Sequence, residues 1–206
     1  MIRRLLLMKI YLIRHGQTDW NVQGRFQGRE DIPLNENGME QAKICGEVLQ
    51  GTQFQAIISS PLKRASKTAQ IIGKYVSVDQ IITDEGITER DFSKVSGMTA
   101  QERDAFYASG EQDDKEPWDD LCARMFATMK TYAEQYPNQN IIMISHGASI
   151  NSVLSVLSQG KTGTGKIFLK NTCINIIDYN NDEFKIEACN LSADEYLTMK
   201  KQHSKS

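Results

Sequence analysis

The chain has few of the residues that build metal sites or covalent cross-links. It contains four cysteines, none of which forms a Cys-x-x-Cys pair or stands at zinc-ligand spacing from a histidine. We therefore expect the four thiols to be reduced and buried, as in a cytoplasmic protein. We find no internal repeat, linker or low-complexity segment, and 206 residues suit a single domain spanning residues 1–206.

The sequence also lacks an excess of charge and a long hydrophobic run. Its 24 Lys and Arg face 26 Asp and Glu, and a non-specific nucleic-acid binder would show a basic excess, so no nucleic-acid partner is expected. The apolar start, Leu5-Leu6-Leu7, is too short to span a bilayer and no cleavage site follows it, so no membrane partner is expected. Residues 1–8 are predicted to be an N-terminal extension, with Met8 a candidate start, and residues 198–206 a frayed basic tail.

Short apolar runs alternate with amphipathic segments along the chain. This order predicts an α/β fold, a three-layer helix-sheet-helix sandwich with a mostly parallel central sheet. Strands are expected at residues 10–13, 54–58, 80–83, 140–145, 172–178 and 184–189. Helices are expected at 35–50, from Ser60 (cap) and Pro61 (first turn), from 118 to 136, and at 148–158. The polar segment 99–117 is interpreted as a solvated face or a mobile lid, and its acidic cluster as no metal site.

Two strands end in the same kind of sequence. Arg14-His15-Gly16 follows the run 10–13, and His146-Gly147 follows the run 140–145. The chain has only three histidines, and the third, His203, lies in the polar tail. One Arg-His-Gly alone is equally consistent with an ordinary polar loop, but strand ends present side chains to a crevice, and the repetition favours a shared site.

Cations near these strand ends point to an anionic ligand. Lys63 and Arg64 fall at the start of a predicted helix, where the helix dipole disfavours positive charge. An anion would resolve this conflict for Arg64, whereas Lys63 is interpreted as a solvated surface charge. If Arg14, Arg64 and the two histidines converge, a phosphoryl group is the expected guest, and a sulfate or carboxylate the alternative. Zinc is not expected beside two guanidinium groups.

These motifs together resemble the histidine phosphatase superfamily, the phosphoglycerate mutase-like proteins. The resemblance covers roughly residues 9–190 in the family's order and spacing. The segments that carry it are Arg14-His15-Gly16-Gln17-Thr18 with Trp20-Asn21, Arg25-Phe26-Gln27-Gly28, Asp31-Ile32-Pro33-Leu34, Gly38-Met39-Glu40-Gln41-Ala42, Ser59-Ser60-Pro61-Leu62-Lys63-Arg64-Ala65, Thr68-Ala69, Ile87-Thr88-Glu89-Arg90-Asp91-Phe92 and Ser145-His146-Gly147.

The resemblance implies a covalent mechanism without metal or cofactor. His15 would attack phosphorus and become a phosphohistidine, and Glu89 would act as the acid and base, with Glu85 as the competing carboxylate. His146 would help to hold the phosphoryl oxygens. The other residues assigned to phosphate binding are Arg14, Asn21, Gln27, Gly28 and Arg64. Ser93 stands where the family most often has Gly, which leaves the placement of Glu89 less defined.

The superfamily contains hydrolases and mutases, so the fold does not decide the reaction. Its mutases carry a longer, Arg-containing segment before the second histidine, where this chain has the short acidic stretch 111–116, and they have Asn at the position of Ala148. Both differences favour a metal-independent phosphatase acting on a small-molecule phosphomonoester. A phosphoglycerate mutase and a non-catalytic phospho-ligand binder stay as alternatives, and the sequence does not distinguish a monomer from a homodimer.

Overall fold

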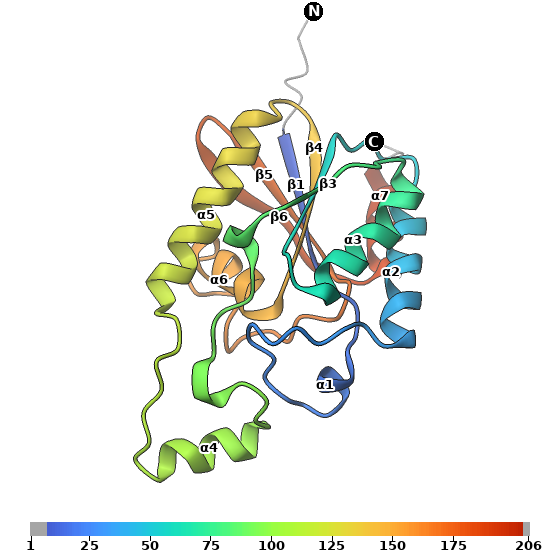
Figure 1. Cartoon of the computed structure of the whole chain (residues 1–206). Helices are drawn as coiled ribbons and strands as arrows, with labels where there is room; N and C mark the ends of the chain where they lie inside the picture. Colours follow the sequence, from blue (N-terminus) through green and yellow to red (C-terminus); the bar gives the residue numbers. More distant parts are fainter. Residues whose placement is uncertain (1–7, 204–206) are drawn as a thin grey trace, which may run out of the picture.

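The computed structural model describes residues 8–203 and is built on one six-stranded sheet of order β3-β2-β4-β1-β5-β6 (Figure 1). Strands β1 to β4 run parallel, whereas β5 pairs antiparallel with β1 and β6 antiparallel with β5. The strands are β1 (Met8–Arg14), β2 (Ala56–Ser59), β3 (Ile81–Thr83), β4 (Asn140–Ser145), β5 (Ile174–Asn180) and β6 (Glu183–Leu191). The predicted mostly parallel sheet in an α/β fold is confirmed.

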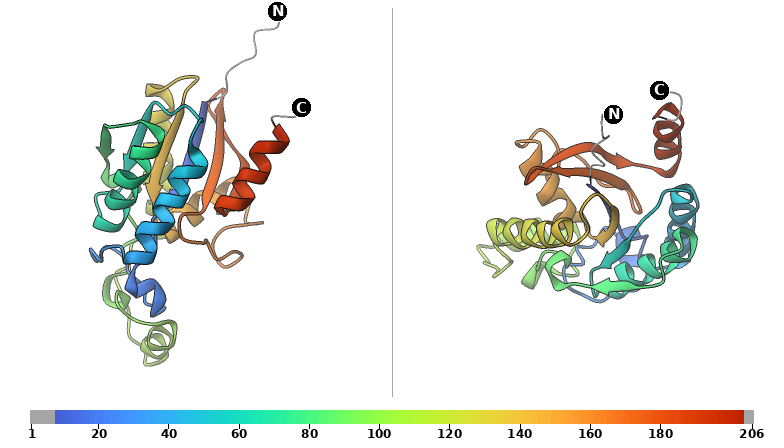
Figure 2. Two further views of the ribbon diagram at one scale, coloured as in Figure 1. Left: turned by 90° about the vertical axis from the view of Figure 1, so that its right-hand side faces the viewer. Right: turned by 90° about the horizontal axis from the view of Figure 1, so that it is seen from above.

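Helices cover both faces of this sheet (Figure 2). One face packs on α5 (Trp118–Gln135) and α6 (Gly147–Leu157), and the other on α2 (Glu36–Leu49), α3 (Lys63–Val76) and α7 (Ala193–His203). Alternate side chains of β1 enter the two cores: Ile10 and Leu12 one, Tyr11 and Ile13 the other. The three-layer sandwich is therefore as predicted, and each fully buried aliphatic side chain stabilises it by roughly 1.5–3 kcal/mol.

The start of α3 differs from the prediction. The helix begins at Lys63, and its N-cap residue Leu62 makes no side-chain capping bond. Ser60, expected to be the cap, instead has its hydroxyl 2.7 Å from Nε2 of His146. The predicted role of Ser60 as the N-cap is therefore wrong, because its hydroxyl contacts a histidine that is distant along the chain.

The folded part of the chain begins earlier and ends later than the sequence analysis predicted. Met8 is the first residue of β1 and is buried, so it does not belong to an extension. Helix α7 continues to His203, because Tyr196 packs on Tyr11 with ring centroids 6.2 Å apart and Lys200 Nζ donates to Gln50 O at 2.7 Å. The predicted frayed tail is thus wrong for residues 198–203. The rest of the predicted extension and tail, residues 1–7 and 204–206, lies outside the described part of the chain.

The polar segment 99–117 contains a helix that hydrophobic periodicity does not reveal. Helix α4 (Ala100–Ala108) has no buried residue and lies away from the sheet (Figure 1). Its start is fixed by a capping box between Thr99 and Glu102. Shorter helical turns are α1 (Asp19–Val22), η1 (Glu85–Ile87) and η2 (Ser93–Val95).

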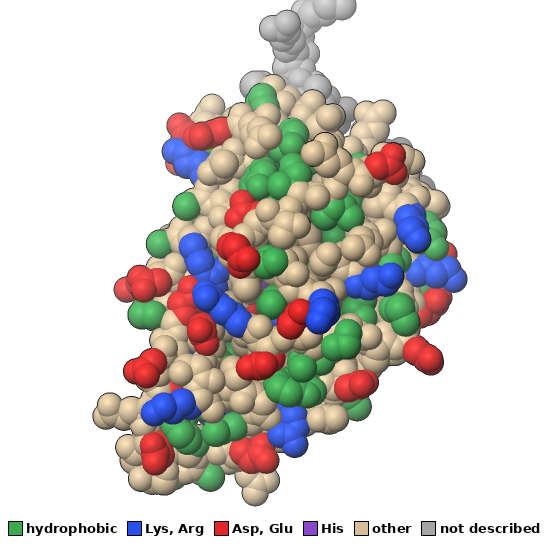
Figure 3. Space-filling model, viewed as in Figure 1, with side chains coloured by type: hydrophobic (Ala, Val, Ile, Leu, Met, Phe, Trp, Pro, Cys, Tyr) green, Lys and Arg blue, Asp and Glu red, His purple; other side chains and the backbone are tan. Residues whose placement is uncertain are grey.

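The thiols and the surface agree in part with the sequence analysis. All four cysteines are free; Cys45 and Cys173 are buried as expected, but Cys122 and Cys189 are only partly buried. On the face shown in Figure 3, acidic and basic side chains are interspersed rather than segregated. Across residues 8–203, no helix combines the length and apolar character needed to cross a membrane.

Candidate active site

The two His-Gly motifs meet because their strands are neighbours. Arg14 at the end of β1 pairs in register with Ser145 at the end of β4, and His15 N donates to Ser145 O at 3.0 Å. Each strand is followed by its histidine at the same edge of the sheet, and the two ring centroids lie 5.1 Å apart. The convergence expected for adjacent parallel strands is therefore present.

His15 is held in one tautomer. Its Nδ1 lies 2.6 Å from Gly16 O, and because a carbonyl only accepts, Nδ1 carries the proton. Burial, and then the charges of Arg64 and Arg14, lower the pKa of His15 well below its ordinary value. The ring is therefore neutral near pH 7, and Nε2, which has no partner among residues 8–203, keeps a free lone pair.

Close backbone packing fixes the loop that carries His15. A Cβ added to Gly16 would lie 2.3 Å from Gly38 O, and one added to Gly38 would lie 2.1 Å from Gln17 O. Only glycine at both positions allows this approach between the loop and the first turn of α2. Asn35 caps that helix by accepting from Gly38 N at 2.8 Å, so the loop and the helix start form one unit.

Arg64 lies fully buried beside the histidines. Its Nε donates to Nδ1 of His146 at 3.2 Å, while Nη1 and Nη2 donate to Glu30 O at 2.5 Å and Gly28 O at 2.8 Å. Burial lowers the pKa of Arg64 to about 10, so the guanidinium stays charged at neutral pH. Lys63 is exposed and pairs with Asp31 at 3.2 Å, which agrees with its interpretation as a surface charge.

His146 contacts protein at both ring nitrogens. Arg64 Nε can only donate, so Nδ1 of His146 accepts and the hydrogen of the neutral ring lies on Nε2, which faces the Ser60 hydroxyl. Burial and the neighbouring Arg64 lower the pKa of His146 well below its ordinary value, which keeps the ring neutral. His146 lies behind Arg64 and does not line the cavity described below, whereas the sequence predicted direct contact with the phosphoryl group.

Arg14 is the second buried guanidinium. Its Nη1 donates to Leu169 O at 2.5 Å, and its Cζ lies 5.7 Å from the ring centroid of Phe168. Its Nε is buried and has no hydrogen-bond partner among the described residues. Burial lowers the pKa of Arg14 from its ordinary value, partly offset by Cys173 and Glu89. A buried guanidinium with an unpaired donor is suited to an incoming anion.

Glu89 caps the helix that follows His146. Its carboxylate accepts from the amides of Ala148 and Ser149, both at 3.1 Å, and so takes the place of a side-chain cap on α6. A Cβ added to Gly147 would lie 3.7 Å from Arg14 Nε and 3.8 Å from Oε2 of Glu89, so the acid and the guanidinium border the same point. The competing carboxylate, Glu85, is exposed and accepts from the Thr88 hydroxyl at 3.1 Å.

A cavity of about 420 Å³ opens over these groups. Most of the predicted site residues line it, together with several that the sequence did not indicate. The lining comprises Arg14, His15, Asn21, Gly24, Arg25, Phe26, Gln27, Arg64, Glu89, Arg90, Phe92, Trp118, Gly147, Ala148, Asn151, Thr164, Gly165 and Phe168. Its volume suits a phosphate ester with a leaving group of moderate size.

Three residues predicted to bind phosphate differ in how they reach the cavity. Asn21 Oδ1 accepts from Thr18 N at 3.1 Å and Asn171 Nδ2 at 3.3 Å, which leaves Nδ2 of Asn21 without a described acceptor. Gln27 is buried, and its Oε1 accepts from the Thr18 hydroxyl at 3.0 Å. Gly28 does not line the cavity, and its carbonyl instead holds Arg64, so its place is behind the guanidinium.

The outer wall of the cavity is aromatic. Phe26 and Trp118 line the cavity, whereas Trp20 and Phe106 do not. Trp20 instead faces Gly97, where an added Cβ would lie 3.3 Å from its ring. Phe92 and Phe168 complete the wall with Thr164 and Gly165. Phe92 ends the motif that contains Glu89, whereas no assigned sequence motif includes the other three.

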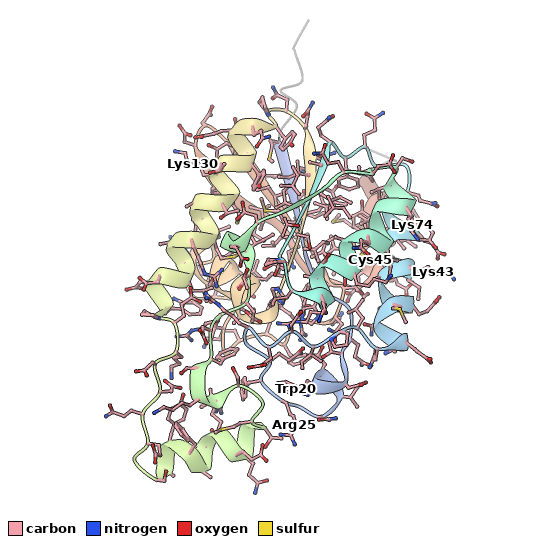
Figure 4. All side chains as sticks on the ribbon, in the orientation of Figure 1. Trp20, Arg25, Lys43, Cys45, Lys74 and Lys130 are labelled. Atoms are coloured by element: carbon pink, nitrogen blue, oxygen red, sulfur yellow. The ribbon has the colours of Figure 1, made fainter. Side chains whose placement is uncertain are left out.

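The outer wall of the cavity also carries two cations. Arg25, which follows α1 (Figure 4), lines the cavity together with Arg90. None of the acidic residues in 111–116 does; Glu116, for instance, pairs with Arg124 at 2.6 Å. The acidic stretch 111–116, which favoured a phosphatase over a mutase in the sequence, therefore does not line the cavity.

Ser93 adopts a backbone conformation that favours glycine. Its φ is +48°, in the left-handed region, and its amide donates to Asp91 Oδ1 at 2.7 Å. Serine is thus accommodated with strain, and the loop that carries Glu89 keeps its turn. Glu89 still reaches α6, so the substitution does not displace it from the cavity.

The described residues contain no group of three or more His, Cys, Asp or Glu side chains placed to hold a metal ion. The charged groups around His15 are mainly the guanidinium groups of Arg14 and Arg64, which suit an anion rather than a cation.

Comparison with known proteins identifies the family. A sequence model of the histidine phosphatase superfamily (branch 1) matches residues 10–192. The chain belongs to this superfamily. Similar proteins of this superfamily are named as phosphatases and phosphoglycerate mutases. The chain is therefore an enzyme of this superfamily.

Three relatives of the superfamily illustrate the match. The chain is 33% identical to the uncharacterized phosphatase PhoE of Bacillus subtilis, over 89% of this chain and 95% of the relative. It is 31% identical to the probable phosphoglycerate mutase GpmB of Proteus mirabilis, over 85% and 86%. A phosphoserine phosphatase of Entamoeba histolytica, solved with 3-phosphoglyceric acid, superposes with a TM-score of 0.78 at 29% identity, over 92% and 99%.

Proposed function

We propose that this enzyme is a metal-independent phosphomonoester phosphatase that works through a phosphohistidine on His15. The observation that carries the proposal is the fixed tautomer of His15. Its Nδ1 hydrogen is held by Gly16 O at 2.6 Å, and the lowered pKa keeps Nε2 unprotonated. A neutral imidazole with one free nitrogen beside two guanidinium groups is an activated nucleophile for a phosphoryl group.

In the first step, Nε2 of His15 attacks phosphorus while the bond from phosphorus to the leaving oxygen breaks. Arg14 and Arg64 neutralise the charge on the phosphoryl oxygens in the transition state, with the Nδ2 of Asn21 and with Gln27 as further hydrogen-bonding groups. Glu89 gives its proton to the leaving oxygen. His146 holds Arg64 through Nδ1, and contact between His146 and the phosphoryl group itself requires its Nε2 to exchange the Ser60 hydroxyl for an oxygen of the substrate.

In the second step, water cleaves the phosphohistidine. Glu89, now a carboxylate, takes a proton from the water as its oxygen attacks phosphorus. The bond from nitrogen to phosphorus breaks, its electron pair returns to Nε2 of His15, and inorganic phosphate leaves. The same acid therefore serves both steps, and the enzyme regains its starting state.

The test measures phosphate release, with a chelator present, from a panel of phosphomonoesters. The panel contains 3-phosphoglycerate, p-nitrophenyl phosphate, sugar phosphates and nucleotides, and compares the wild type with His15→Ala. Release that survives the chelator and disappears in the variant is expected. Release abolished by the chelator in the wild type would contradict metal independence, and release by the variant would contradict the nucleophile.

A phosphoglycerate mutase is the second candidate, favoured by the relatives named as probable mutases and by the cations Arg25 and Arg90 on the outer wall. Ala148, where the superfamily's mutases have Asn, favours hydrolysis instead. Conversion of 3-phosphoglycerate to its 2-isomer without release of phosphate would replace the phosphatase proposal by a mutase. Failure to label or turn over any ester would favour a non-catalytic phospho-ligand binder.

A further inference from the structure

The two oxygens of the Glu89 carboxylate have different surroundings. Oε1 receives three donors: Arg90 N at 2.9 Å, and the amide and the hydroxyl of Ser149, both at 3.1 Å. Oε2 receives Ala148 N at 3.1 Å and borders Gly147, which lines the cavity. One oxygen is thus saturated by protein donors, and the other is open to the substrate.

This difference determines which oxygen of Glu89 can carry a proton. A proton on Oε1 would oppose donors that already point at that oxygen, and at least one of their bonds would be lost. A proton on Oε2 leaves all three bonds to Oε1 in place, with Oε1 acting as the carbonyl oxygen of the acid. The oxygen that faces the substrate is therefore the one that gains and loses the proton.

Ser149 supplies two of the three donors to Oε1 and is fully buried. Its hydroxyl also lies 2.7 Å from Thr88 O, but that carbonyl already accepts from Arg124 Nη1 at 2.7 Å. The single hydroxyl hydrogen can therefore serve Glu89 without leaving the carbonyl unpaired. No sequence motif marks this serine, since it lies two residues beyond the His146-Gly147 motif.

We propose that Ser149 is a positioning residue for the acid: its amide and hydroxyl fix Oε1 so that Oε2 exchanges the proton with the leaving group. The inference rests on the proposed function, in which Glu89 protonates the departing alkoxide. It also predicts a specific signature. Loss of the hydroxyl harms esters whose leaving group needs a proton, and spares esters whose leaving group departs as a stable anion.

The experiment compares benzyl phosphate with p-nitrophenyl phosphate, two esters of similar size whose leaving groups differ in acidity. The readout is kcat/KM, which reports the transfer to His15 and not the later attack of water. For Ser149→Ala we expect kcat/KM to fall about tenfold for benzyl phosphate and less than about threefold for p-nitrophenyl phosphate. The ratio of the two values does not depend on the folded fraction of the sample.

Two further variants test whether the effect comes from the hydroxyl of Ser149. Ser149→Cys keeps the size of the side chain but donates weakly, and should shift the ratio in the same direction by less. Ser152→Ala is the matched control, because Ser152 is equally buried on α6 but its hydroxyl donates to Ser149 O at 2.7 Å rather than to Glu89. We expect Ser152→Ala to leave the ratio at its wild-type value.

Each result has a distinct meaning. Equal losses for the two esters in Ser149→Ala, or no loss in either, would overturn the positioning role while leaving the phosphatase intact. The same shift of the ratio in Ser152→Ala would also overturn it, since the effect would then belong to the packing of α6. A wild type that hydrolyses neither ester would contradict the proposed function itself.

Discussion

The two ends of the cavity are built differently. At the inner end, Arg14, His15, Arg64 and His146 are all buried, and each is held by a backbone carbonyl or by another member of the set. At the outer end, Arg90, Phe92 and Trp118 are half-buried, and Phe168 is 83% exposed.

The supporting elements differ in the same way. The inner groups project from the ends of the central strands β1 and β4 and from the first turn of α3. The outer groups come from the segment 90–118 and the loop 158–170, which lie beyond the sheet. The inner groups, which are proposed to bind the phosphoryl group, are therefore held rigidly, whereas the wall at the outer end is open to adjustment. Changes at the inner end should therefore affect every substrate alike, and changes at the outer end should depend on the substrate.

The largest effect is expected at His15. The variant His15→Ala removes the proposed nucleophile, and we expect kcat to fall by on the order of 10³-fold or more for every ester. Steady-state phosphate release measures this loss. Retention of more than a few per cent of activity on any ester would mean that another group attacks phosphorus.

Arg64→Lys should have the next largest effect. Lysine keeps the charge but cannot donate to His146, Glu30 O and Gly28 O together, so the cation is no longer fixed. We expect kcat/KM to fall roughly 10²-fold, equally for all esters. Lys63→Ala, the adjacent exposed cation, is the control and should stay within about twofold. Comparable losses in both variants would show that net charge, and not the fixed fork, matters.

The inner end should also make stability depend on pH. Because the folded-state pKa of His15 is lowered, the unfolded state binds more protons below about pH 6.5, and stability declines as the pH falls through that value. Between pH 7.5 and 5.5 the wild type should lose more unfolding free energy than His15→Asn, by up to about 1.4 kcal/mol. Urea unfolding at both pH values measures the difference. Identical losses would indicate that His15 is not buried in its neutral form.

Phe168→Ala probes the outer end. Removing an exposed ring beside Arg14 should change KM by roughly threefold to fivefold for esters with large leaving groups, and little for small ones. The experiment ranks kcat/KM across the ester panel for wild type and variant. A uniform loss across the panel would contradict the division of the cavity into a fixed and an adjustable end.

Ser93→Gly should have the smallest effect. Glycine relieves the strain of the positive φ but adds freedom to the unfolded chain, so we expect a gain of up to about 1 kcal/mol in unfolding free energy. Thermal or urea unfolding measures this gain. Ser77→Gly, at another positive φ in the C-cap of α3, is the matched comparison. Destabilisation by Ser93→Gly alone would mean that the serine side chain holds the loop that carries Glu89.

The division between the two ends also explains what the sequence could predict. His15, His146 and Arg64 were found because strand ends and helix starts leave a local signature, and their meeting follows from parallel pairing. The partners of His146, Arg14 and Arg64 were not predicted, because Ser60, Leu169 O and Gly28 O contact these side chains only through the tertiary fold.

The outer end had almost no local signature. Helix α4 is marked by a capping box but no apolar stripe, and Phe92 and Phe168 stand in loops with no periodicity. The docking of α7 depends on the buried Tyr196 and on the partly buried Leu197 and Met199, which stand among polar residues without a clear periodic stripe. These segments could not be predicted from local sequence patterns, because their conformation depends on residues that are distant along the chain.

Trapping a phosphohistidine would show whether phosphate passes through Nε2 of His15, as proposed. The wild type is mixed with its best ester, quenched in alkali because phosphohistidine is labile to acid, digested, and analysed by mass spectrometry. We expect one phosphoryl group on the peptide that contains His15. This group should be absent from the His15→Ala variant and should be lost on acid treatment. Turnover with no phosphoryl group on this peptide, or with the group on the peptide containing His146, would contradict the account.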